Sequence, residues 1–75
     1  MGDLTSDPAE LSLSAEEVEL LQLLGHGLPL ETVARRLRTS ERTVRRRTKV
    51  ICDRMGVDFP IQAVVWAAQR GLIGP

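Results

Sequence analysis

The centre of the chain carries a row of cationic side chains at helical spacing. They recur at i, i+3, i+4 and i+7 and are followed by an acid at i+11: Arg42, Arg45, Arg46, Lys49 and Asp53. A helix would place all of them on one side. Guanidinium and ammonium groups bind phosphate oxygens, and an arginine can also donate two hydrogen bonds to O6 and N7 of guanine. This row therefore has the chemistry to bind a polyanion such as duplex DNA.

The other side of the same segment is apolar, as expected of a helix that packs against a core and so holds the cations in position. Its residues, at i, i+4, i+7 and i+11 with one neighbour, are Val44, Thr48, Ile51, Met55 and Cys52. The pattern predicts an amphipathic helix from Glu41 to Met55 that packs through one side and leaves its cations free.

The charges of the chain are strongly segregated, although the net charge is zero. Residues 1–34 contain seven acids and no lysine or arginine. Residues 35–54 contain nine basic and two acidic residues, a net charge of +7. A polyanion responds to this local charge rather than to the average, so the segregation also favours a nucleic-acid partner.

Composition excludes several other classes of protein. No two groups have the spacing of an acid/base pair, a nucleophile or a metal site, so we expect no enzyme, cofactor, metal or small-molecule ligand. His26 and Cys52 each lack a partner nearby in sequence, and Cys52 reads as a buried apolar residue. Trp66 and Phe59 are the only aromatic residues, too few for a single-strand stacking platform. Neither a signal peptide nor a membrane segment is apparent, and a cytoplasmic location is expected.

Local signals predict an all-α chain. The expected helices run from Ser14 to Gly25, from about Pro29 to Leu37, from Glu41 to Met55 and from about Pro60 to Arg70. Ser14 with Glu17 fits a capping box, Ser40 can cap the third helix, and Gly56 can end it. Residues 1–11 read as a disordered lead-in or linker remnant, and residues 12–75 as one four-helix domain.

The second and third helices, joined by the tight connection 38–40, form a helix-turn-helix pattern. In this motif the second helix enters the major groove of DNA, so the helix from Glu41 to Met55 is the expected recognition helix. Ser40, Arg42 and Thr43 near its start suit phosphate contacts that set its position. For Arg36 on the preceding helix, a phosphate contact and simple solvation both stay open.

The last helix is apolar nearly all round, so it has more apolar surface than a core this small can cover. One of its faces is expected to pack inside and another to meet a partner. Val65, Trp66 and Gln69 are the residues expected at a homodimer interface, and ordinary core or surface positions are the alternative.

In the order and spacing of its conspicuous residues, the chain resembles the output domain of the LuxR (GerE-type) family of bacterial transcription regulators. The anchors, in order, are Leu13-Ser14, Glu17, Leu20-Leu21, Gly27-Leu28, Val33-Ala34, Leu37, Ser40-Glu41-Arg42-Thr43-Val44, Ile51, Met55-Gly56-Val57, Gln62-Ala63-Val64 and Gly71-Leu72-Ile73. The resemblance implies sequence-specific binding of double-stranded DNA, with base contacts from Arg45, Arg46 and Lys49. It also implies a homodimer on a two-fold symmetric site, and RNA polymerase is a candidate partner.

The chain departs from the family pattern at the turn. Arg38 and Thr39 stand where hydrophobic residues are usual, and we expect a looser turn there. Arg47 and Arg54 lie on a flank of the recognition helix, where pairing with acids such as Glu16 or Glu19 competes with phosphate contact. A second function stays open, in which the basic helix binds an acidic protein surface rather than DNA.

Overall fold

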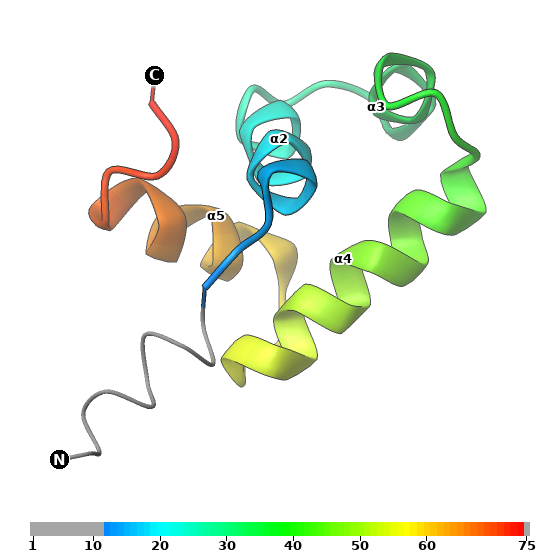
Figure 1. Cartoon of the computed structure of the whole chain (residues 1–75). Coiled ribbons are helices and arrows are strands. Elements are labelled where there is room, and N and C mark those ends of the chain that lie inside the picture. The colour runs from blue at the N-terminus through cyan, green and yellow to red at the C-terminus, as the bar shows by residue number, and fades with distance from the viewer. Residues whose placement is uncertain (1–11, 75) are drawn as a thin grey trace, which may run out of the picture.

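The computed structural model describes residues 12–74, and the expectation for residues 1–11 lies outside this range. Four helices follow one another in the described part of the chain: α2 (Ala15–Gly25), α3 (Leu30–Arg36), α4 (Glu41–Met55) and α5 (Pro60–Gln69). No strand occurs between residues 12 and 74. The all-α prediction is confirmed, and Figure 1 shows α2 among the other three helices, with the longer α4 running past it.

Serine side chains fix the starts of α2 and α4. Ser14 Oγ accepts a hydrogen bond from the Glu17 amide at 3.1 Å, and Glu17 Oε1 accepts one from the Ser14 amide at 3.0 Å. Ser40 Oγ accepts from the Thr43 amide at 3.1 Å. These caps satisfy amides that have no partner within the helix, so both predicted starts are confirmed.

Leucine, valine and isoleucine from three helices make the centre of the core. The largest fully buried side chains are Leu20, Leu21, Val33, Val44 and Ile51. From α5, by contrast, only the small residues Ala63 and Ala67 are fully buried. They lie one turn apart, so α5 packs most closely through these two alanines. Val64 and Trp66 are partly buried against the core, and Ile61 and Val65 are exposed.

The turn between α3 and α4 is tightly hydrogen-bonded, and the expectation of a looser turn is wrong. The Thr39 amide donates to the Ala34 carbonyl at 2.9 Å, and the Arg38 amide donates to the Arg35 carbonyl at 3.1 Å. Together these bonds make a Schellman motif, which requires a left-handed residue between helix and turn. Arg38 adopts that conformation, with φ of 58°. The backbone hydrogen bonds hold the turn without a hydrophobic side chain.

The C-terminal end folds back onto α2. Gln22 Nε2 donates to the Gly74 carbonyl at 2.8 Å, and Gln22 Oε1 accepts from the Gly74 amide at 3.3 Å. Ile73 beside it is buried in the core. Among the described residues, every helix is too short or too polar to cross a bilayer.

Candidate nucleic-acid interface

Helix α4 divides into a buried and a cationic side. Val44, Ile51 and Cys52 are buried, while Arg42, Arg45, Arg46 and Lys49 are all exposed. Thr48 is also buried, and its hydroxyl donates to the Val44 carbonyl at 2.7 Å, which satisfies a polar group inside the core. The predicted amphipathic arrangement of this helix is therefore confirmed.

The exposed residues of α4 are not equally placed around its axis. Successive residues are rotated by about 100° in an α-helix. On this basis Arg46 lies opposite the core, and Arg42 and Asp53 lie close to the same line. Lys49 is rotated by about 60° from Arg46 and Arg45 by about 100°. Arg45 therefore borders the packed side. Its side chain would have to be fully extended to reach the base edges in a DNA groove.

Two of the expected base-contact residues form weak ion pairs within α4. Arg45 Nη2 lies 3.5 Å from Glu41 Oε1, and Lys49 Nζ lies 3.5 Å from Asp53 Oδ2. All four side chains are well exposed, and such i,i+4 pairs contribute only about 0.3–0.5 kcal/mol. Within residues 12–74 no carboxylate lies within 4.0 Å of the Arg46 guanidinium group. Arg45, Arg46 and Lys49 can therefore bind phosphate or base ligands with little loss of contacts inside the domain.

Ser40 and Thr43 share one small hydrogen-bond network at the start of α4. Ser40 Oγ accepts from the Thr43 amide and donates to Thr43 Oγ1 at 3.1 Å. Because the Ser40 hydroxyl is occupied as a cap, the Thr43 hydroxyl is the group left to donate to a phosphate. Contacts of both residues with phosphate stay predictions.

Arg36 lies in a cluster of which the sequence predicted only the proximity of Arg47 to Glu16 or Glu19. It lines a hollow with Arg38 and Arg47, and the acids Glu16 and Glu19 of α2 lie on the same hollow. Arg38 is an exposed cation beside the recognition helix and was missed as a site residue. Its charge and its place in the turn were the available signals.

Arg54, on the same flank of α4, is used for structure. Arg54 Nη2 donates to Glu17 Oε1 at 2.7 Å. This hydrogen bond is the main cause that lowers the pKa of Glu17. The partner is Glu17 rather than Glu16 or Glu19, the two acids named from the sequence.

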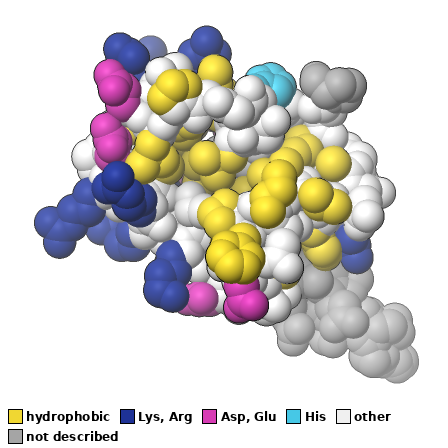
Figure 2. Space-filling view, turned by 180° about the vertical axis from the view of Figure 1, so that it is seen from behind, with side chains coloured by type: hydrophobic (Ala, Val, Ile, Leu, Met, Phe, Trp, Pro, Cys, Tyr) yellow, Lys and Arg dark blue, Asp and Glu magenta, His cyan; other side chains and the backbone are white. Residues whose placement is uncertain are grey.

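The outer face of α5 is apolar and brings the expected dimer residues together. Val65, Trp66 and Gln69 line one shallow hollow with Val57, Ile61 and Gln62. Ile61 is 63% exposed and Val65 46%, so this side of the helix has no cover within the described chain. Figure 2 shows apolar side chains gathered across this side of the molecule, with lysine and arginine along one edge. Ile61 was missed, although it precedes Val65 by one turn.

A short helix, a tight turn and a longer helix with a free cationic side define a helix-turn-helix domain of the nucleic-acid-binding class. A family model described as bacterial regulatory proteins, luxR family, matches residues 11–67. The chain belongs to this family of DNA-binding transcription regulators, and the resemblance found in its sequence is confirmed.

Two curated relatives show how the chain compares with whole regulators. It is 35% identical over 58 residues to the nitrate/nitrite response regulator protein NarL of Escherichia coli strain K12, a match covering 77% of this chain and 27% of the relative. It is 34% identical over 64 residues to the transcriptional regulatory protein YdfI of Bacillus subtilis strain 168, covering 85% of this chain and 30% of the relative. The chain thus spans about three tenths, or slightly less, of the length of these relatives. No solved structure matches the chain significantly.

Proposed function

We propose that this domain binds double-stranded DNA in a sequence-specific manner, with α4 in the major groove. The observation that carries the proposal is the exposed cationic side of α4 opposite its buried side. The groove is about 12 Å wide and admits one helix with its side chains. A helix that packs through Val44 and Ile51 can present its free side to the base edges without disturbing the core.

The residues divide by the ligands they can reach. Arg46 and Lys49 are assigned the base contacts, together with Arg45, which would reach a base from the edge of the helix. The phosphate contacts are assigned to side chains around the start of α4 and the end of α3: Ser40, Arg42, Thr43 and Arg36. Phosphate contacts fix the position of the domain, and base contacts select the sequence.

The domain acts as a homodimer on a two-fold symmetric site. Supporting this is the apolar outer face of α5, where the exposed Val65 and Ile61 adjoin Trp66. Exposed apolar patches of this kind are typical of protein interfaces. Two α4 helices related by a two-fold axis would read half-sites about one helical turn of DNA apart.

The relatives support a role as the DNA-binding part of a longer transcription regulator. One is named a nitrate/nitrite response regulator protein and the other a transcriptional regulatory protein. By analogy, a separate domain would supply the signal and this domain would select the promoter, where RNA polymerase is a further partner.

The test is selection of binding sites from a randomised duplex pool at about 0.15 M salt, beside the triple variant Arg45→Ala/Arg46→Ala/Lys49→Ala. We expect wild type to enrich a two-fold symmetric, guanine-containing motif, which the triple variant loses. The control variant Arg35→Ala removes an exposed cation outside this set and should keep the motif. Log affinity should also fall with log salt with a slope of about −0.9 per phosphate contacted. Binding that ignores sequence would favour an acidic protein surface as the partner instead.

A further inference from the structure

One apolar residue stands among the cations on the free side of α4. Val50 is 51% exposed, whereas the other valine of this helix, Val44, is fully buried. Val50 also lies outside the hydrophobic core and outside the group of partly buried residues packed against it. Packing of the core therefore does not explain an aliphatic side chain at this position.

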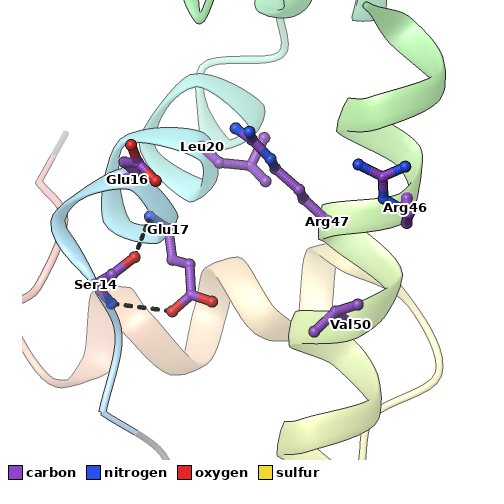
Figure 3. Close-up of a pocket in the computed structure, with 7 residues that line it drawn as sticks. All are labelled: Ser14, Glu16, Glu17, Leu20, Arg46, Arg47 and Val50. Carbon is purple, nitrogen blue, oxygen red and sulfur yellow. Dashed lines mark hydrogen bonds between the residues drawn. The ribbon is translucent and has the colours of Figure 1, made fainter. Parts of the chain in front are cut away.

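Val50 lies close to the line of α4 that faces away from the core. It follows Arg46 by four residues, so the two side chains are rotated by only about 40° around the axis. This places Val50 nearer to that line than Lys49 or Arg45. Figure 3 shows Val50 one turn after Arg46, while Arg47 reaches toward Leu20 on α2.

The neighbours of Val50 leave its methyl groups accessible. The hollow beside it is lined by Arg46, Arg47 and Leu20, with acidic side chains at its α2 edge. Glu17 in this hollow is already paired with Arg54, and Arg46 and Arg47 can bind phosphate, so the charged side chains around Val50, and not Val50 itself, serve the sugar-phosphate backbone. The base edges at the floor of the groove are then the DNA atoms left for this side chain.

We propose that Val50 is a specificity-determining residue that contacts the C5-methyl group of a thymine. This inference rests on the proposed function, since it assumes α4 in the major groove. Valine has no group that binds phosphate or forms a hydrogen bond. The only apolar group that a base presents in this groove is the thymine methyl. Burying the two against each other removes apolar surface from water.

The helix geometry also places the thymine relative to the base read by Arg46. One helical turn advances 5.4 Å, and successive base pairs are 3.4 Å apart. The thymine should therefore lie about one or two base pairs from the guanine that Arg46 contacts. A motif selected from random DNA should show this G–T spacing in each half-site.

The test removes single methyl groups from the DNA. Each thymine of the selected duplex is replaced in turn by uracil, which lacks only the C5-methyl, and dissociation constants are measured for wild type and Val50→Ala. We expect wild type to lose about fourfold in affinity at one thymine per half-site, the effect of one buried methyl group. Val50→Ala should bind the thymine and uracil duplexes equally. The control Leu72→Ala, an exposed apolar residue outside α4, should keep the wild-type uracil sensitivity.

Three results would overturn the inference. If wild type binds specifically but keeps its affinity with uracil at every position, it makes no contact with a thymine methyl group. If Val50→Ala still loses about fourfold in affinity on the uracil duplex, another side chain contacts the methyl group. Wild type that selects no sequence overturns the proposed function together with this inference. A thermal melt of Val50→Ala separates a loss of folding from a loss of contact, because removing an exposed valine should leave the midpoint almost unchanged.

Discussion

The guanidinium group of Arg54 lies 2.7 Å from the carboxylate of Glu17, and this contact joins the end of α4 to the first turn of α2. The same oxygen, Glu17 Oε1, accepts the Ser14 amide of the capping box. Both side chains are partly buried, 35% and 23% exposed. One carboxylate therefore caps α2 and holds the recognition helix against it, so the charge of Glu17 connects two elements far apart in sequence.

This contact predicts a pH-dependent part of the stability. The hydrogen bond from Arg54 lowers the pKa of Glu17 below its ordinary value of 4.5. A lowered folded-state pKa means that the stabilisation is present above pH 4.5 and is lost as the pH falls through the folded-state value. We expect Glu17→Gln to reduce the free energy of unfolding by about 1 kcal/mol at neutral pH. The deficit should shrink below pH 4.5, as measured by urea titrations. Glu16→Gln, on the same turn but exposed, should show little deficit at any pH. A deficit that stays constant with pH would contradict the role of the charge.

The left-handed turn residue predicts a stabilising substitution. Arg38 has φ of 58°, a conformation that costs an ordinary residue roughly 1–2 kcal/mol and glycine nothing. Part of that gain is offset by the greater freedom of glycine in the unfolded chain. We expect Arg38→Gly to raise the free energy of unfolding by about 0.5–1 kcal/mol, read from the denaturant midpoint. Arg35→Gly, within α3, should instead lower it by about 1 kcal/mol. Equal effects of the two glycines would refute the conformational argument.

Local chemistry made the helix boundaries predictable. Ser14, Ser40 and Gly56 each act on the backbone within four residues of themselves, and all three behave as expected. Apart from Val50, the free side of α4 was equally predictable, because its cations and its apolar residues alternate with the helical period. These features depend on sequence neighbours, so the sequence contains all the information that they need.

Contacts between helices could not be predicted in the same way. Glu16, Glu17 and Glu19 share one turn of α2, and only the crossing of α2 and α4 selects Glu17 as the partner of Arg54. In α5 nearly every residue is apolar, so periodicity does not show which side packs. The structure buries Ala63 and Ala67 and leaves Ile61 outside, because small side chains allow a closer approach of the backbone.

Gln22 predicts that the C-terminal end stabilises the whole domain. Its side chain makes two hydrogen bonds to the Gly74 backbone and so holds Ile73 in the core. We expect Gln22→Ala to lower the free energy of unfolding by about 1–2 kcal/mol and to speed hydrogen exchange at the Gly74 amide. Gln69→Ala, exposed on the outer face of α5, is the matched control and should change neither quantity. Unchanged exchange at Gly74 in Gln22→Ala would show that the end is held by Ile73 alone.

The outer face of α5 predicts how self-association responds to charge. Val65 is 46% exposed beside Ile61 and Trp66, and a homodimer through this face would bury it. An aspartate placed there would be an unpaired buried charge at the interface, which costs several kcal/mol. We therefore expect Val65→Asp to raise the dimer dissociation constant at least about tenfold, the equivalent of 1.4 kcal/mol. Sedimentation equilibrium over a range of protein concentrations measures this constant. Val50→Asp is the matched control, since Val50 is similarly exposed but lies on α4. If both variants, or neither, shift the dissociation constant, the interface does not run through α5.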